Sequence, residues 1–218
     1  MKRIIIIGEG QTEQSFCNDV MGPHFVPMGI YLQNAVIKKT HGGIVNWPAL
    51  KYQIEKHLLQ DSKVIVTTLI DYYGIHSTYN YPDWAVAEER ADPNARMIIL
   101  EKAMSNDVSP KLRSRFIPYV QLHEFEGLLF CDLKVFKDSF EDNEFNDYDY
   151  LVSTIETNEN PELINNGSDT APSKRLTSIL KGYRKVLHGP LIAESIGLNV
   201  IREKCPRFNN WIDKLENI

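Results

Sequence analysis

The sequence predicts an α/β fold with a mainly parallel central sheet that is flanked by helices. Two observations indicate this class. Apolar runs of strand length recur along the first part of the chain, and segments with apolar residues at helical spacing lie between them. Strands that alternate with helices in this way form βαβ units, in which successive strands are parallel.

Four segments are expected to be strands of this sheet. The first and the third are almost continuously apolar, as strands are when helices cover both faces of a sheet. Gly8 and Gly10 close the first run, and the third ends at Asp71. The expected strands are residues 3–7, 30–37, 63–70 and 116–122.

Helices are expected between these strands and after the last one. Thr12 is expected to cap the first helix, and Glu13 falls in its first turn, where the helix dipole favours an anion. Pro48 suits a first helical position, and Ser173 is expected to cap a later helix. The expected helices are residues 12–22, 48–59, 93–104, 172–181 and, in pieces broken at residues 197 and 206, 190–215.

Four stretches are less regular. Residues 41–43 are expected to turn, and residues 127–136 fit either a helix or a further strand. Residues 72–92 form a long, aromatic-rich connection, and connections of that length are usually functional or mobile. Residues 138–169 hold ten acidic residues and no lysine or arginine, which predicts a surface insertion or a loosely packed lobe.

We therefore expect a single domain over residues 1–218. Its core would span about 1–137, its acidic insertion about 138–170 and its helical C-terminal part about 171–218. With 218 residues and 43% hydrophobic content, the chain can bury a core of ordinary size. This composition excludes intrinsic disorder as a description of the whole chain.

The charge of the chain indicates which partners it can attract, and its cysteines indicate the cellular compartment in which it works. The net charge of −5 argues against attraction of the whole molecule to nucleic acid, although residues 171–218 hold nine Lys/Arg and four acids. That segment either forms a local phosphate-binding face or neutralises the acidic insertion. Three scattered cysteines, no recognisable signal peptide and no membrane-length apolar run predict a cytoplasmic protein without a membrane partner.

Acidic residues follow three of the predicted strands. Glu9 comes after the first strand, Asp71 after the third, and Glu124 and Glu126 after the fourth. Ligands of open parallel sheets bind outside the carboxyl ends of the strands, where these side chains would meet. Converging carboxylates repel one another unless a cation neutralises them, and hard oxygen ligands suit Mg²⁺ or Mn²⁺. Any one of these acids alone could instead be a solvated loop end or a helix cap.

The segment around residues 123–126 leaves alternatives open. Glu124 and Glu126 would share a face only if this stretch is extended, because on a helix they would diverge by about 200°. His123 could orient an attacking water or could be a structural residue. The loop Gly8-Glu9-Gly10 lacks the third glycine of a dinucleotide fingerprint, so NAD binding is a poor interpretation.

Five motifs resemble a known protein family. They occur in order over residues 4–215, and the family was long catalogued as an uncharacterised domain before being placed with the Toprim nucleases. The motifs are Gly8-Glu9-Gly10-Gln11-Thr12-Glu13, Asp71-Tyr72-Tyr73-Gly74, His123-Glu124-Phe125-Glu126 with the following Gly-Leu-Leu-Phe, Pro172-Ser173-Lys174-Arg175-Leu176, and Cys205-Pro206-Arg207-Phe208 with Trp211.

The resemblance implies a Toprim-like fold and divalent-metal chemistry on phosphodiesters. It also implies kinship with OLD-type nucleases and with the nuclease subunit of PARIS-type phage defence, which works beside an ATPase and attacks tRNA. Glu9 matches the acid after the first strand that serves as general acid or base. Asp71 matches the first acid of the metal-binding Asp-x-Asp, but Tyr73 stands at the second position. Glu124 or Glu126 would have to supply the missing carboxylate.

The expected function is therefore that of a Mg²⁺- or Mn²⁺-dependent endonuclease, an effector of phage defence that cuts tRNA, other RNA or DNA. Glu9, Glu13 and His123 are the candidate catalytic residues. The candidate metal ligands are Glu9, Asp71, Glu124 and Glu126, and the candidate phosphate-binding residues are Lys174, Arg175 and Lys185.

Lys174 and Arg175 are expected to face the acids, because a helix that starts near them would favour phosphate at its N-terminus. The expected partners are nucleic acid and an ATPase of the AAA or ABC type, with a homodimer as a further option. The alternatives are a subunit that senses nucleic acid or docks on the ATPase with little catalysis, and a small-molecule phosphohydrolase.

Overall fold

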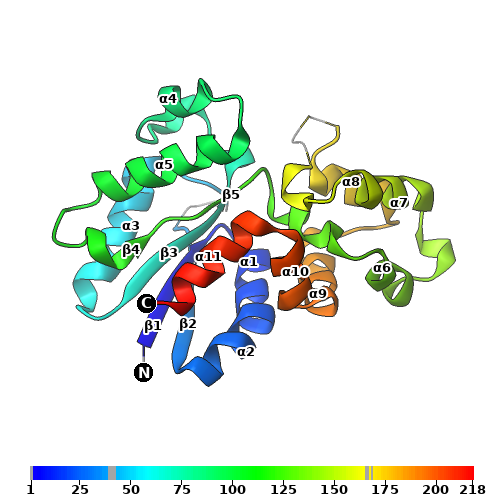
Figure 1. Ribbon diagram of the computed structural model, residues 1–218, viewed down its shortest axis with the longest axis horizontal. Coiled ribbons are helices and arrows are strands. Elements are labelled where there is room, and N and C mark those ends of the chain that lie inside the picture. The colour runs from blue at the N-terminus through cyan, green and yellow to red at the C-terminus, as the bar shows by residue number, and fades with distance from the viewer. Residues whose placement is uncertain (1, 39–42, 165–166, 168) are drawn as a thin grey trace.

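A computed structural model describes residues 2–38, 43–164, 167 and 169–218. A parallel sheet lies at the centre of the described chain, with the strands in the order β2-β1-β3-β4 and with β5 pairing with β3 beyond β4 (Figure 1). Because each of these pairings is parallel, the carboxyl ends of the strands meet at one edge, as the sequence predicted. The strands are β1 (Lys2–Gly8), β2 (Ile30–Val36), β3 (Ile65–Asp71), β4 (Phe116–Ile117) and β5 (Val120–Gln121).

Helices cover both faces of the sheet, which explains the uninterrupted apolar run of β1. Ile4 and Ile6 belong to one core, and Ile5 and Ile7 belong to a second core on the opposite face. The first core contains residues of the π-helical turn (Phe16–Met21) that continues α1 (Gln11–Ser15), and of α2 (Gly22–Phe25), α9 (Lys185–Ile196), α10 (Leu198–Lys204) and α11 (Pro206–Glu216). The second contains residues of α3 (Trp47–Gln60), α4 (Trp84–Glu88) and α5 (Pro93–Asp107).

The first helical segment differs from the prediction at both ends. Gly10, not Thr12, precedes the first helical residue, and its N–H donates to Glu13 Oε2 at 2.9 Å. The segment does not end near residues 21–23 but passes through a π-helical turn (Phe16–Met21), α2 and a 3₁₀ turn (Val26–Met28). The π turn ends at Met21, two residues before Pro23, where an α-helix would lose a hydrogen bond and meet the proline ring. The chain leaves the helix at Gly29, with a φ of 70°.

The fourth predicted strand is divided into β4 and β5. Pro118 lies between them and has no N–H to donate to a ladder. Thr68 of β3 bridges the gap with its side chain, because Oγ1 accepts from Tyr119 N at 2.9 Å and donates to Tyr119 O at 2.8 Å. The sheet therefore continues past the proline by side-chain hydrogen bonds.

The structure decides two segments for which the sequence made no single prediction, residues 127–136 and residues 72–92. Residues 127–136 are helical, in a 3₁₀ helix (Phe125–Cys131) and in α6 (Leu133–Ser139). The connection 72–92 includes α4 and buries Tyr72, Ile75 and Tyr81 in the second core, so it is not a loose loop. Of the predicted turn at residues 41–43, positions 41 and 42 lie outside the described residues.

The acidic segment is a packed helical lobe. It contains α7 (Tyr148–Thr157), which packs against α8 (Pro172–Ile179), and both lie with α6 away from the sheet (Figure 1). Leu151 of α7 is fully buried in the first core. Ala171 precedes α8, so Ser173 lies inside the first turn and is not its cap. The predicted breaks at residues 197 and 206 are present between α9, α10 and α11.

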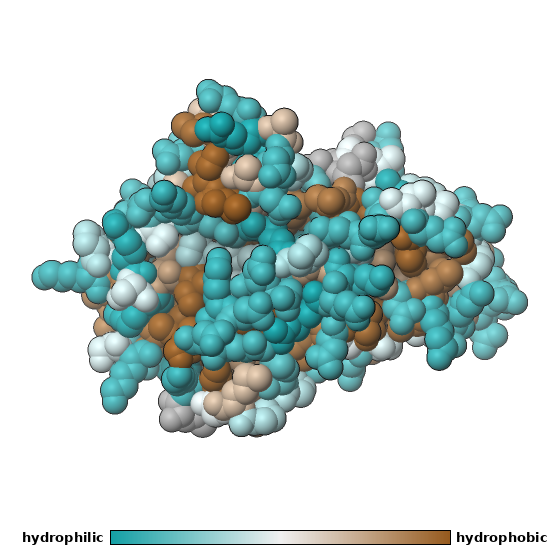
Figure 2. Space-filling view, viewed as in Figure 1, coloured by the Kyte–Doolittle hydropathy of each residue, from teal (hydrophilic) through white to brown (hydrophobic). Residues whose placement is uncertain are grey.

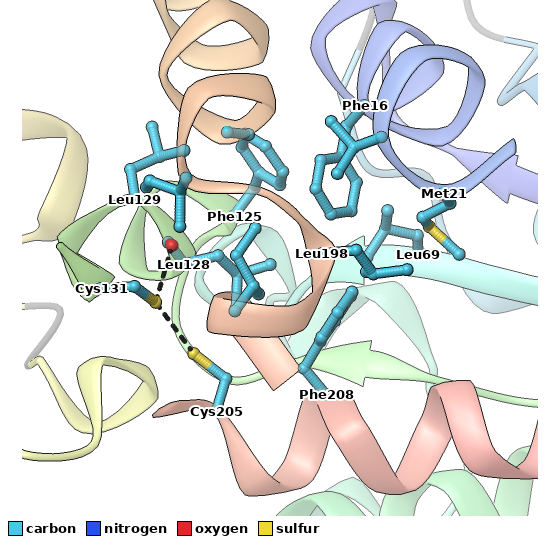
Figure 3. Close-up of a cluster of buried hydrophobic side chains, with 14 of the residues drawn as sticks. Phe16, Met21, Leu69, Phe125, Leu128, Leu129, Cys131, Leu198, Cys205 and Phe208 are labelled. Atoms are coloured by element: carbon cyan, nitrogen blue, oxygen red, sulfur yellow. Dashed lines mark hydrogen bonds between the residues drawn. The ribbon is translucent and has the colours of Figure 1, made fainter. Parts of the chain in front are cut away.

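An aromatic cluster ties the C-terminal helix to the edge of the sheet. Phe16, Phe125 and Phe208 converge on one another, with centroid distances from Phe16 of 5.1 Å and 5.8 Å (Figure 3). The sulfur atoms of Cys131 and Cys205 lie nearby, 3.6 Å apart. Both are buried free thiols, as is Cys17.

The surface in Figure 2 is mostly hydrophilic, with apolar side chains showing over α4 and α5. Val86 and Ile98 are exposed on these two helices. Among the residues placed by the structure, no helix combines the length and the apolar character that crossing a membrane requires.

Candidate functional site

The acids after β1 and β3 lie side by side at the carboxyl edge of the sheet. Gly8 of β1 pairs with Leu69 of β3 in parallel register, so Glu9 reaches the end of β3. The backbone N–H of Asp71 donates to Glu9 Oε1 at 2.7 Å. The structure therefore joins these two predicted site residues by a direct hydrogen bond.

Lys185 lies at the centre of the acids. Its Nζ atom is 3.1 Å from Glu126 Oε2, 3.8 Å from Asp71 Oδ2 and 4.0 Å from Glu13 Oε1. We call Glu9, Glu13, Asp71 and Glu126 the carboxylate cluster. Its members come from the loop after β1, from α1, from the end of β3 and from the 3₁₀ helix at residues 125–131.

Two glycines permit this close approach. A Cβ atom at Gly8 would lie 3.0 Å from Glu13 Cβ, so a larger residue would push α1 away from the strand end. A Cβ atom at Gly189 of α9 would lie 3.3 Å from Thr12 Cγ2 of α1. Because α9 begins with Lys185, the close packing at Gly189 brings the ammonium group to the cluster.

The two glutamates after the fourth predicted strand point to different places, because this stretch is helical and not extended. His123 has a φ of 63°, in the left-handed region, and the chain then enters the 3₁₀ helix. Asp71 Oδ1 accepts from Phe125 N at 2.9 Å and fixes the start of that helix. Glu126 enters the cluster, whereas Glu124 accepts hydrogen bonds from Ser173 N at 2.9 Å and Ser173 Oγ at 3.0 Å. The N-terminus of α8, expected to receive phosphate, is therefore occupied by Glu124.

Burial makes three of the acids, Glu9, Asp71 and Glu126, hard to ionise. It raises the pKa of Glu9 to about 7, against the hydrogen bond from Asp71 N–H and with a further upward contribution from Glu13. Burial also raises the pKa values of Asp71 and Glu126, and the Lys185 ammonium only partly opposes this. For Lys185, burial would lower the pKa, but Asp71, Glu126 and Glu13 raise it overall. One ammonium group therefore does not balance the charge that four ionised carboxylates would carry.

The cluster supplies the donor atoms of a divalent-metal site, but Lys185 lies between them. Within the described residues, no three His, Cys, Asp or Glu side chains stand close enough to hold a metal ion in this arrangement, in which Lys185 separates the acids. The donor atoms themselves are carboxylate oxygens, which suit Mg²⁺ or Mn²⁺. Glu126 is fully buried, and its Oε1 atom has no hydrogen-bond partner among the described residues. A buried unpartnered oxygen needs an explanation, and a cation held there would provide one, so the donor set fits the metal.

His123 does not join the carboxylate cluster. Burial, and after it the charge of Arg96, lowers the pKa of the imidazole to about 4. The charged residue that acts on the imidazole is therefore Arg96 of α5, not a member of the carboxylate cluster. The imidazole is neutral at pH 7. Its Nδ1 atom has no partner within the part of the chain that the structure describes.

The predicted phosphate-binding pair also lies away from the cluster. Arg175 donates to Thr170 O at 2.8 Å and to Thr154 Oγ1 at 3.1 Å, and its guanidinium lies 5.3 Å from the centre of the Tyr150 ring. It holds α8 to α7, so the expectation that it faces the acids is wrong. Lys174 is exposed on α8. Of the three predicted phosphate-binding residues, the structure brings only Lys185 to the cluster.

Sequence reasoning missed two features of the site. The central position of Lys185 between the acids was not foreseen, because only the packing of α9 on α1 creates it. The role of Ser173 as the partner of Glu124 was also missed, and the sequence holds no local signal that pairs residues 124 and 173. Tyr73, at the position where the resemblance would place a second aspartate, is half-exposed, and its N–H donates to His123 O at 3.0 Å.

The chain was then compared with known proteins. A search of curated proteins and a search of solved structures gave no match. A family model described as a domain of unknown function, DUF4276, matches residues 8–216, which include every member of the carboxylate cluster. With a match over nearly its whole length, the chain belongs to the DUF4276 family.

Proposed function

We propose that the protein is a Mg²⁺- or Mn²⁺-dependent endonuclease that hydrolyses phosphodiester bonds of RNA or DNA. One observation carries the proposal. Four carboxylates from separate segments converge at the carboxyl edge of a parallel sheet, around a single cationic group. This is the edge at which open α/β sheets bind ligands. Burying several acids next to one another lowers the stability of the folded protein, and a catalytic role would explain why they are there.

The geometry assigns roles within the cluster. Asp71 and Glu126 are the principal candidate ligands, because both are buried and both direct an oxygen toward Lys185 Nζ. Glu13 is a third, with a side chain only 5% exposed. A bound Mg²⁺ or Mn²⁺ would act as a Lewis acid toward a phosphate oxygen and would make water more acidic. Glu124 is left out of the ligand set, because both of its oxygens accept hydrogen bonds from Ser173.

Glu9 is the candidate general acid or base. Its pKa of about 7 allows it both to accept and to release a proton near neutral pH, which is the range in which acid–base catalysis is most effective. The residue as a whole is partly exposed, so a substrate or a water molecule can approach it. The hydrogen bond from Asp71 N–H orients one of its oxygens and leaves the other available.

The motif resemblance extends the proposal to a Toprim-like nuclease in the cytoplasm that acts in phage defence beside an ATPase. This extension is supported by the positions of two acids. Glu9 follows β1 and Asp71 ends β3, which are the places where the resemblance requires acids. Tyr73 remains a departure from the expected Asp-x-Asp, and Glu126 stands in for the second acid.

The test is a cleavage assay on tRNA, other RNA and plasmid DNA with Mg²⁺ or Mn²⁺, repeated with an ATPase added where a neighbouring gene encodes one. We expect cleavage that EDTA abolishes and that Asp71→Asn removes. Glu194→Gln, on the exposed side of α9, is the matched control and should cleave like wild type. Cleavage that persists in EDTA or in Asp71→Asn would exclude the mechanism.

Two other outcomes identify the alternative functions. Hydrolysis confined to mononucleotides would identify a small-molecule phosphohydrolase. Nucleic-acid or ATPase binding without any cleavage would identify a sensing or docking subunit. The second alternative has one observation in its favour, because the Lys185 ammonium already occupies the centre of the acids.

A further inference from the structure

The central position of Lys185 raises the question of how it relates to a metal ion. Its Nζ atom has three carboxylates within 4.0 Å, and they belong to the residues best placed to be metal ligands. Mg²⁺ binds carboxylate oxygens at about 2.1 Å, which requires the oxygens to close in on one point. The ammonium group occupies the space between Asp71 and Glu126 where that point would lie.

Lys185 and a divalent cation cannot share this space. Two cations a few ångströms apart inside a partly buried site repel one another strongly, because little solvent screens them. The carboxylates cannot move apart to make room, since Glu126 is fully buried and the Glu13 side chain is 5% exposed. One of the two cations must therefore leave when the other enters.

The lysine is the group that can move. Its side chain is 40% exposed, whereas the acids around it are buried. It is the first residue of α9 and follows an exposed turn in which Gly182 has a φ of 65°. A lysine stem has four rotatable bonds and carries a compact charge, which allows the ammonium to swing toward solvent.

We infer that Lys185 and the catalytic divalent cation occupy the centre of the carboxylate cluster by turns. This inference rests on the proposed function and adds a regulation of the same site. Without metal, the ammonium offsets part of the negative charge of the acids. When metal enters, Lys185 is released to the rim of the site, where it is positioned to contact a substrate phosphate. The lysine therefore sets the metal affinity of the site.

The experiment is a titration of metal-free protein with Mn²⁺, followed by calorimetry. Lys185→Met removes the charge and nearly keeps the length of the side chain. We expect it to bind Mn²⁺ at least about tenfold more tightly than wild type, because the competing cation is gone. Lys185→Arg keeps the charge and should bind no more tightly than wild type. Lys174→Met, on exposed α8, is the matched control and should leave the affinity unchanged.

A second measurement uses the wild-type chain, so it does not depend on the folding of a variant. Acetylation by an amine-reactive reagent is followed at Lys185 and at Lys174 by mass spectrometry, with Mg²⁺ or with EDTA. Release of the ammonium should increase acetylation of Lys185 several-fold in Mg²⁺ while acetylation of Lys174 stays constant. Equal acetylation of Lys185 in the two conditions would overturn the exchange.

The failures of the two proposals can be told apart. If wild type and Lys185→Met both bind Mn²⁺ with equal affinity, the exchange is wrong and the metal site stands. If Lys185→Met binds more weakly, Lys185 assists the metal and the exchange is again wrong. If neither protein binds Mn²⁺, the metal site is wrong and the exchange is overturned with it.

Discussion

The backbone N–H of Asp71 donates a hydrogen bond of 2.7 Å to Glu9 Oε1 and so connects the ends of β1 and β3. The side chain of the same aspartate accepts from Phe125 N at 2.9 Å and faces Lys185 Nζ at 3.8 Å. Asp71 is therefore the residue through which three segments of the site are held in register. Its substitution should affect both geometry and charge, and variants of its neighbours are cleaner probes of each.

Glu9→Gln separates catalysis from stability. The amide can still accept the hydrogen bond from Asp71 N–H, but it can neither ionise nor transfer a proton. Cleavage should fall by about 10²–10⁴-fold, as expected for loss of a general acid or base. Metal-free stability should be unchanged or higher, because one acid of a repulsive cluster is removed. Single-turnover cleavage and thermal unfolding in EDTA measure the two effects, and wild-type cleavage rates would rule out the role.

The pKa of Glu9 predicts a pH dependence of stability in the metal-free protein. Its folded-state pKa is about 7, against 4.5 for the ordinary side chain. Below pH 4.5 both states are protonated, and between pH 4.5 and 7 the unfolded chain releases a proton that the folded chain retains. Folding is therefore disfavoured progressively as the pH rises through this window, and by about 3 kcal/mol at most above it.

The measurement is urea unfolding in EDTA at pH 5 and pH 8, for wild type and for Glu9→Gln. Wild type should lose stability relative to the variant on going to pH 8. Glu162, whose pKa burial also raises to about 7, contributes to both proteins and cancels in the comparison. A wild type that gains stability relative to Glu9→Gln would contradict the assignment.

Glu124 and Glu126 should behave differently, although the sequence presents them as a pair. Glu126→Gln should reduce Mn²⁺ affinity and cleavage, since Glu126 faces the centre of the cluster. Glu124→Gln should leave Mn²⁺ affinity within about twofold, because Glu124 is held by Ser173. Glu124→Gln should instead lower the free energy of unfolding by about 1–2 kcal/mol, because it weakens charge-assisted hydrogen bonds at the N-terminus of α8. Equal losses of Mn²⁺ affinity in the two variants would restore the pair as ligands.

Arg175→Ala should destabilise the lobe and leave nucleic-acid binding unchanged. The guanidinium bonds Thr170 and Thr154 and lies over the Tyr150 ring, contacts that together stabilise the protein by about 1–3 kcal/mol. Urea unfolding measures this loss, and Lys174→Ala on the exposed face is the control. Fluorescence anisotropy at two salt concentrations should give the same affinity and salt slope as wild type. A flatter slope for Arg175→Ala would show that the arginine contacts phosphate.

Local sequence patterns were sufficient to predict a parallel sheet flanked by helices and to place two of the acids. The run at residues 4–7 required helices on both faces, and alternation of strands with helices required parallel pairing. Glu9 and Asp71 could be placed at the carboxyl edge because each directly follows a run of strand-forming residues. A strand end is a local property, set by the few residues on either side of it.

The composition of the site depended on contacts between distant segments. Lys185 reaches the cluster because Gly189 lets α9 pack closely on α1, more than 170 residues earlier in the chain. Glu124 leaves the cluster because the left-handed turn at His123 starts a 3₁₀ helix and because Ser173 binds its carboxylate. Arg175 turns toward α7 because the packed helical lobe offers it Thr154 and the Tyr150 ring as partners. Charge and residue type made these side chains candidates, but only tertiary packing determines which oxygen faces which cation.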